Sequence, residues 1–172
     1  MTKIKATLIS EKVTSNTAEA HNLFSTSRFG EKLGEKIIYS LHEALYLVQD
    51  KKMDIFDYRD NKLLQKEILK KFSRIDKNFK TKYLTFKDLR KNGYIVKTAL
   101  KFGAEFRVYE KGSKLSGHSK WLCFPVSENK QLTWQDFSAK NRVAHSTKKN
   151  LLIAVVDDEA DISYFEIKWT RI

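Results

Sequence analysis

Three residues in the C-terminal half of the chain have side chains suited to acid–base chemistry: Tyr109, His118 and Lys149. Each lies in a segment whose local pattern predicts a polar side chain pointing out of a packed, strand-rich domain. Together they offer a proton acceptor, a proton donor and a fixed positive charge, the set that cleavage of RNA without a metal ion requires. Taken singly, each is more often an ordinary surface side chain, so residue type alone leaves both interpretations open.

The strand that carries Tyr109 is indicated by alternating apolar and polar residues. Residues 104–110 follow a strand at 94–99 across a short turn, and Phe106 and Val108 share one face of the second strand. Because successive side chains of a strand point to opposite faces, Tyr109 is expected on the other face.

His118 and Lys149 stand just before two further predicted strands. His118 lies in a polar, glycine-containing stretch ahead of the strand 121–126, in which Pro125 marks the end or an edge position. Lys149 precedes the apolar strand 151–156. Both residues are therefore expected close to the start of a strand.

The rest of the pattern predicts two mixed α/β domains. Asp76 to Asn78 break the periodicity, so we expect an N-terminal α/β domain at 1–78 and a C-terminal catalytic domain at 79–172, with a central mixed sheet flanked by helices. The other expected elements are short strands and loops up to residue 38, a helix opened by a capping box of Ser40 and Glu43, a strand at 53–58, and helices at 62–76, 82–92 and 133–145.

The charge of the chain favours a polyanionic partner. Lys and Arg number 33 against 21 acidic residues, which gives a net charge of +12. Such an excess attracts phosphate backbones with little dependence on sequence. A proteome rich in lysine would produce the same excess, and the lysines form no single linear patch, so charge alone leaves nucleic-acid binding open.

Cysteine content and hydropathy exclude other classes. Cys123 stands alone, which excludes an intramolecular disulfide and a multi-cysteine zinc site. No apolar run reaches the roughly 18–20 residues that span a bilayer. The N-terminus lacks the apolar region of a signal peptide, so a cytoplasmic protein is expected.

Longer motifs around these residues resemble a known family. The stretches YLTFKDLRKNGYIVKTALKFGAEFRVYEKG, GHS and RVAHSTKKNLLIAVVDDEADISYF resemble the archaeal tRNA-splicing endonucleases over residues 83–165, and SLHEALYL at 40–47 extends the resemblance into the first half. The resemblance implies a restriction-endonuclease-like catalytic domain. It also implies cleavage of the bulge-helix-bulge of intron-containing precursor tRNA, leaving 2′,3′-cyclic phosphate and 5′-hydroxyl ends.

The resemblance also assigns roles within the site. Tyr109 takes the position of the family's base, His118 that of its acid, and Lys149 that of its catalytic lysine, whereas Lys148 aligns with a basic, non-catalytic neighbour. An ordinary imidazole titrates near pH ~6.5 and so supplies an acid at neutral pH, but a tyrosine is a weak base unless cations lower its pKa. The implied chemistry uses neither a cofactor nor a metal.

The resemblance also implies roles for an arginine and for an acidic turn. Arg142 matches an arginine that stacks on an extruded bulge base, an interaction tolerant of base identity, whereas the second stacking arginine has no secure match. His145, beside it, is interpreted as structural. The acidic turn between the last two predicted strands matches a loop that inserts into a basic cleft of another subunit; its carboxylates are Asp157, Asp158, Glu159 and Asp161.

The sequence therefore predicts the catalytic subunit of a tRNA-intron lyase that acts on precursor tRNA and assembles with other subunits. Structural subunits of the family lack the full Tyr-His-Lys set, which argues against the alternative of a non-catalytic RNA-binding subunit. A homotetramer and a heterotetramer with a structural subunit both remain open, as does the breadth of RNA substrates. The final strand, 162–169, is a candidate for pairing across a dimer interface.

Overall fold

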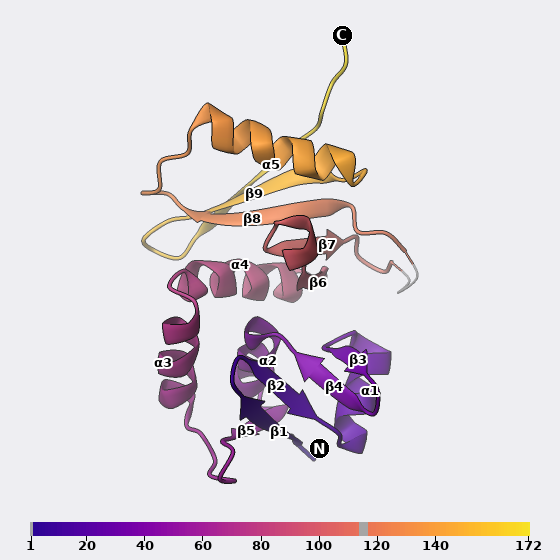
Figure 1. The fold of residues 1–172 in the computed structure, drawn as a ribbon, viewed down its shortest axis with the longest axis vertical. Coiled ribbons are helices and arrows are strands. Elements are labelled where there is room, and N and C mark those ends of the chain that lie inside the picture. Colours follow the sequence, from indigo (N-terminus) through magenta and orange to yellow (C-terminus); the bar gives the residue numbers. More distant parts are fainter. Residues whose placement is uncertain (1, 114–116) are drawn as a thin grey trace. The chain divides into compact units, whose positions relative to one another are not determined.

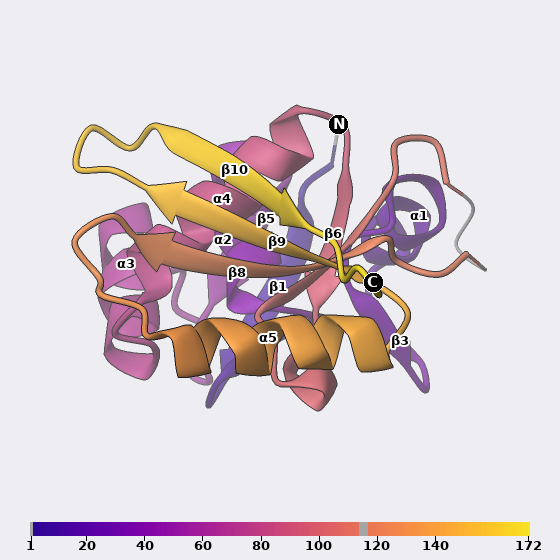
Figure 2. The ribbon, with the colours of Figure 1, turned by 90° about the horizontal axis from the view of Figure 1, so that it is seen from above.

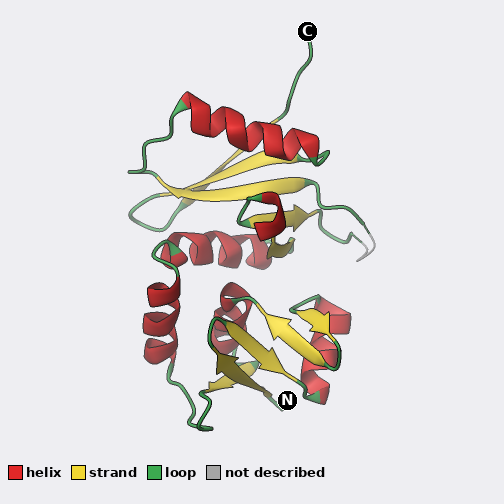
Figure 3. Ribbon diagram, in the orientation of Figure 1, coloured by secondary structure: helices red, strands yellow, loops and turns green. Residues whose placement is uncertain are grey.

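The computed structural model describes residues 2–113 and 117–172 (Figure 1). The chain divides into two compact units, Met1–Phe79 and Lys80–Ile172. Both are mixed α/β structures (Figure 3), so the predicted fold class is confirmed. Within the described residues, none of the helices is both long enough and apolar enough to cross a membrane.

The N-terminal unit is built on a five-stranded mixed sheet with the order β3-β4-β2-β1-β5. β1 and β5 are parallel, and the other neighbouring strands are antiparallel. The elements are β1 (Ile4–Ile9), β2 (Lys12–Ser15), α1 (Ala18–Ser27), β3 (Glu31–Leu33), β4 (Lys36–Tyr39), α2 (Leu41–Gln49), β5 (Met53–Phe56) and α3 (Gln65–Ile75).

The predicted capping box of α2 is present and reaches further than the helix itself. The buried Glu43 carboxylate accepts hydrogen bonds from the Ser40 backbone at 3.0 Å and from the Gly30 backbone at 2.9 Å. Gly30 has φ +78°, and a Cβ there would lie 2.4 Å from Cγ2 of Ile37. Only glycine combines this backbone conformation with such close packing, so one carboxylate fixes both the helix start and the preceding loop.

The first 38 residues differ from the prediction of strands and loops alone, because they contain helix α1. Thr17 caps this helix by accepting a hydrogen bond from the Ala20 backbone at 3.3 Å. Ala20 is the helix's buried residue. With so narrow an apolar side, α1 lacks the hydrophobic periodicity by which a helix is recognised in sequence.

The C-terminal unit is built on a second five-stranded sheet, with the order β10-β9-β8-β7-β6. β8 and β9 are parallel, and the remaining pairs are antiparallel. The elements are α4 (Phe79–Lys91), β6 (Ile95–Thr98), a 3₁₀ turn (Leu100–Phe102), β7 (Phe106–Tyr109), β8 (Trp121–Ser127), α5 (Trp134–Ser146), β9 (Asn150–Val156) and β10 (Ile162–Ile167).

Helices α4 and α5 cover opposite faces of this second sheet (Figures 1 and 2). On the α4 face, the Phe86 and Phe106 rings lie 5.9 Å apart. On the α5 face, Ala144 packs with Leu122 and Leu151 in the buried core. The two faces of β7 therefore have different neighbours, which decides where its polar side chains point.

Pro125 neither ends β8 nor places it at the edge of the sheet, because β8 continues to Ser127 between β7 and β9. Its position is nevertheless compatible with a missing N–H. β7 pairs with β8 only as far as Cys123, so at Pro125 the side toward β7 has no partner strand to receive a hydrogen bond.

Candidate active site

The pairing of three strands brings Tyr109 and Lys149 to the same row of the sheet. Val108 of β7 is paired with Trp121 of β8, which is paired with Asn150 of β9. One position further toward this end of the sheet, Tyr109, Lys120 and Lys149 lie side by side, with Lys120 in the middle. These three positions are here called the row. Since neighbouring strands lie about 4.8 Å apart, the backbones at Tyr109 and Lys149 are separated by about 10 Å.

Both residues belong to the α5 face of the sheet. Arg107 is paired with Leu122 and Leu122 with Leu151, and these leucines lie in the core under α5. Tyr109 follows Arg107 by two residues and Lys149 precedes Leu151 by two, so alternation keeps both on this face. The predicted separation of Tyr109 from the buried Phe106 and Val108 is confirmed.

The end of α5 determines which of two adjacent lysines faces the sheet. The Lys148 backbone donates to His145 O at 2.9 Å and the Lys149 backbone donates to Ala144 O at 2.9 Å, while Lys148 has φ +56°. These two bonds and the left-handed residue form a Schellman motif with Lys148 in the position that favours glycine. Lys148 is exposed, whereas Lys149 is half-buried.

The Lys149 ammonium is held over the α5 face by specific neighbours. Its Nζ donates to the Thr147 carbonyl at 2.8 Å and lies 5.3 Å from the centre of the Phe102 ring. Burial, and then the positive charge of Arg107, lower the pKa of Lys149. The side chain is therefore a positioned cation with a weakened hold on its proton.

His118 lies at the same end of the sheet, in the connection between β7 and β8. The Lys120 backbone, two residues later, donates to Val108 O at 3.0 Å, and Ser119 between them is buried. His118 itself is exposed. Residues 114–116 of the predicted glycine-containing stretch lie outside the described residues. The anchored end of the loop thus holds an exposed imidazole beside the row of Tyr109 and Lys149.

Three neighbours of this row were not predicted from the sequence. Arg107 and Phe102 define the surroundings of Lys149, and Lys120 occupies the middle position of the row. The Lys120 ammonium turns toward the Glu110 carboxylate and the Trp121 ring, and the Glu110 contact raises the pKa of Lys120. The only sequence signal was the spacing of Arg107, two residues before Tyr109 and so on the same face of a strand.

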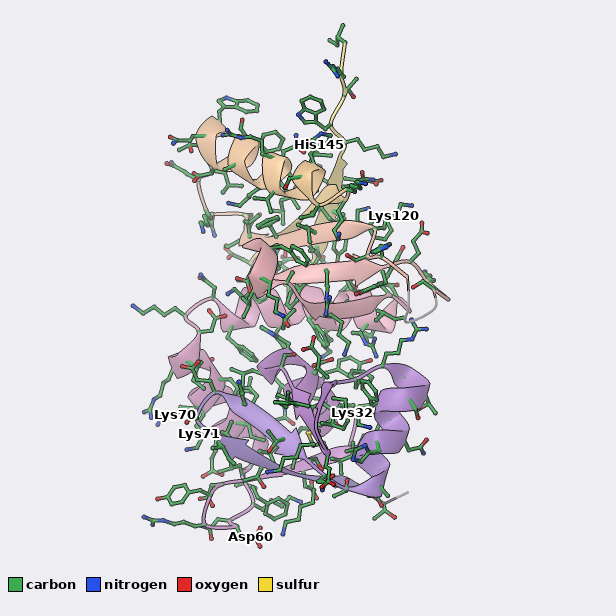
Figure 4. All side chains as sticks on the ribbon, turned by 45° about the vertical axis from the view of Figure 1, so that its right-hand side comes forward. Lys32, Asp60, Lys70, Lys71, Lys120 and His145 are labelled. Atoms are coloured by element: carbon green, nitrogen blue, oxygen red, sulfur yellow. The ribbon has the colours of Figure 1, made fainter. Side chains whose placement is uncertain are left out.

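Arg142 and His145 lie on α5, whose end precedes the row. Arg142 is exposed, and the structure gives no contact between it and Tyr109, His118 or Lys149 within the described part of the chain. His145 is also exposed and stacks on Trp169, with the ring centres 4.4 Å apart (Figure 4). Its ring contact agrees with the interpretation of a structural residue, but that contact lies at the surface and not in a core.

The acidic turn lies at the opposite end of the sheet. It joins β9 to β10 (Figure 2), so the length of β9 separates it from Lys149, about 23 Å for seven residues. The Asp161 backbone donates to Asp157 Oδ1 at 2.8 Å, and Asn129 Nδ2 donates to Asp158 Oδ1 at 3.3 Å. The turn is thus braced by its own backbone and by the loop after β8, and it is separate from the row.

A cavity of about 330 Å³ opens on the α4 face, away from the row. Tyr164 donates to Asp88 there at 2.8 Å, and Trp121 donates to Glu166 at 3.0 Å, so its polar groups are largely satisfied by one another. Within the described residues, no three His, Cys, Asp or Glu side chains gather as metal ligands would.

Comparison with known proteins bears on the whole chain. A sequence model for the tRNA intron endonuclease catalytic C-terminal domain matches residues 79–164, and one for the tRNA intron endonuclease N-terminal domain matches residues 4–69. The tRNA-splicing endonuclease of Pyrococcus abyssi is 42% identical over 165 residues, which cover 95% of this chain and 95% of that protein.

Two further relatives give the same result. The tRNA-splicing endonuclease of Thermococcus kodakarensis is 41% identical over 165 residues, covering 95% of this chain and 96% of that protein. The tRNA-splicing endonuclease of Methanothermobacter thermautotrophicus is 38% identical over 156 residues, covering 90% of each chain. The resemblance predicted from the motifs is confirmed, and so is the prediction of an enzyme of this kind. The chain belongs to the tRNA intron endonuclease family and contains both its N-terminal and its catalytic C-terminal domain.

Proposed function

We propose that the chain cleaves precursor tRNA at intron–exon junctions within a bulge-helix-bulge, by acid–base transesterification at the row of Tyr109 and Lys149. The observation that carries this proposal is the strand register, which supports placing the Tyr109 and Lys149 side chains on one face of the sheet, with their backbones about 10 Å apart. His118 stands in the adjoining loop.

The proposed reaction needs three contributions. Tyr109 accepts the proton of the ribose 2′-hydroxyl as its oxygen bonds to the adjacent phosphorus. His118 gives a proton to the 5′-oxygen as the bond from phosphorus to that oxygen breaks. Lys149 stabilises the negative charge that builds on the phosphorane-like transition state. The products are a 2′,3′-cyclic phosphate and a 5′-hydroxyl, and the balance of atoms requires no cofactor and no metal.

Substrate and subunit contacts complete the proposal. Arg142, exposed on α5, stacks its guanidinium on an unpaired bulge base. The acidic turn, with Asp157, Asp158, Glu159 and Asp161, docks into a basic cleft of a second subunit in a tetramer, homomeric or heteromeric. The braced conformation of the turn supports this role, because a preformed loop loses little conformational entropy on binding.

Cleavage of a bulge-helix-bulge RNA in EDTA tests the function. The chain alone, or with a structural partner subunit supplied, should cut at the intron junctions. The resulting 2′,3′-cyclic phosphate ends should not be joined by a ligase that requires a free 3′-hydroxyl. Absence of cleavage in both arrangements would remove the catalytic proposal and leave a structural, RNA-binding subunit.

A further inference from the structure

The N-terminal unit carries a strongly basic surface on helix α3. Lys66, Lys70 and Arg74 follow one another at intervals of four residues, Lys71 lies beside them, and all four are exposed. Since residues four apart in a helix lie on the same side, they form one continuous face, here called the α3 basic face. In Figure 4, Lys70 and Lys71 stand together on the outer side of α3.

The cations of this face lack the acidic partners that other lysines of the unit have. Lys3, Lys5 and Lys52 are within 3.4 Å of aspartate carboxylates. In the described part of the chain, by contrast, no carboxylate forms an ion pair with the four residues of the α3 basic face. Glu67 is the acid of the helix, and its carboxylate accepts from the Leu64 backbone at 2.7 Å instead.

This arrangement works against the helix that carries it. Like charges one turn apart, such as Lys66 with Lys70 and Lys70 with Arg74, repel and destabilise a helix. The opposite side of α3 is fixed in the unit, with Ile68 and Phe72 fully buried. The buried side excludes insertion of the helix into a membrane surface, which would need those apolar side chains free. A helix face whose positive charges have no acidic partners, on a helix held in place by its buried side, is typical of a surface that binds a polyanion.

We propose that the α3 basic face binds the sugar–phosphate backbone of the RNA substrate, at a place other than the phosphodiester that is cleaved. From Lys66 to Arg74 the face is about 12 Å long, given the helical rise of ~1.5 Å per residue. That length matches three or four phosphates at the roughly 3.4 Å axial spacing of a duplex strand. The contact carries no sequence information, so it contributes affinity and orientation. This inference rests on the proposed RNA substrate.

The acidic turn of a second copy is a poorer match for the same surface. Two of its carboxylates already accept hydrogen bonds within their own subunit, Asp157 from the Asp161 backbone and Asp158 from Asn129 in the loop after β8. A two-stranded turn is about 5 Å wide, less than half the length of the face. A linear polyanion neutralises all four cations, whereas a compact turn does not.

The test compares two variants with the same loss of charge in the same unit. In one, Lys66, Lys70, Lys71 and Arg74 are all changed to Gln, which keeps a good helix former at each exposed position. The control changes four exposed lysines of the same unit that lie outside α3; these are Lys12, Lys32, Lys36 and Lys51. A third variant, Lys66→Arg with Lys70→Arg and Lys71→Arg, retains the charge.

Binding is measured with a precursor tRNA that carries 2′-deoxyribose at the cleavage positions, so that affinity is read without reaction. At 0.15 M salt the α3 variant should bind at least about tenfold more weakly than the control, and its plot of log affinity against log salt should be shallower by about three. The arginine variant should bind like the wild type. On cleavable RNA, the α3 variant should raise KM and leave kcat unchanged.

Two results would overturn the inference. Equal affinity and equal salt dependence of the α3 variant and the control would mean that the face is only solvated. A lower assembled mass of the α3 variant in light scattering, with the control unaffected, would assign the face to a subunit contact. Either outcome is independent of catalysis, because failure of the proposed function appears as absent cleavage by the wild type, and not as a difference between variants.

Discussion

The contrast between Lys148 and Lys149 makes a sharp prediction, because the two lysines are adjacent in sequence but differ in exposure, backbone conformation and side-chain contacts. Lys148→Gly should stabilise the protein. A left-handed conformation costs a non-glycine residue roughly 1–2 kcal/mol of stability, and Lys148→Gly removes this cost. Glycine also raises the conformational entropy of the unfolded chain, which lowers stability by about 0.5–1 kcal/mol. A net gain of about 0.5–1 kcal/mol raises the Tm by roughly 1–4 °C in a chain of this size. Its cleavage rate should stay within about twofold of the wild type.

Lys149→Met should lose activity without losing stability. Burial and Arg107 lower the pKa of Lys149, so the folded protein bears a cost for its charge, and an apolar side chain of similar length should leave the stability unchanged or higher. The rate should nevertheless fall by about 10²–10³, the loss typical for one electrostatic contact to a transition state. Single-turnover cleavage and thermal unfolding of both variants give the two readings. A rate defect in Lys148→Gly as large as that in Lys149→Met, or none in Lys149→Met, would refute the assignment of the two lysines.

Three further predictions concern Lys149, the acidic turn and Gly30. On RNA whose leaving 5′-oxygen is replaced by sulfur, for which His118 need not be protonated, kcat/KM should fall on the alkaline side below the usual pKa of lysine, about 10.4, because the active form is the protonated Lys149 and its proton is lost as pH rises through a lowered pKa; Lys149→Arg should move this limb to higher pH, and an unmoved limb would assign it elsewhere. Substituting Asp157, Asp158 and Asp161 by lysine should lower the assembled mass in light scattering, and an unchanged mass would count against the docking role. Gly30→Ala should destabilise the N-terminal unit by about 2–4 kcal/mol, since its new Cβ would lie 2.4 Å from a β4 side chain at a positive φ; an unshifted urea midpoint would contradict this packing.

Much of the fold was predictable because its signals are local. The capping box at Ser40 starts the helix that it predicts, the helix predicted from residue 133 is capped by Thr133, and the alternation around Tyr109 gives the observed faces of β7. Helix α4 begins at Phe79, earlier than the predicted residue 82, because the basic, polar first turn gives little apolar periodicity. Helix α1 was missed for the same physical reason.

The site was less accessible from sequence, because it depends on pairing between distant strands. Nothing local reveals that Tyr109 and Lys149 occupy one row, which the register of β7, β8 and β9 decides. The surroundings of Lys149, with Phe102 and Arg107, likewise come from chain segments more than 40 residues away. Motif order identified the residues, whereas tertiary structure supplies their electrostatics.

The role of His118 as the acid is the most direct test of the proposed chemistry. His118→Ala should cleave ordinary bulge-helix-bulge RNA about 10²–10⁴-fold more slowly than the wild type, the usual contribution of a positioned acid. If the leaving 5′-oxygen is replaced by sulfur, which departs without protonation, the same variant should cleave within about tenfold of the wild type. An equal defect on both substrates, or no defect on the ordinary RNA, would contradict the account.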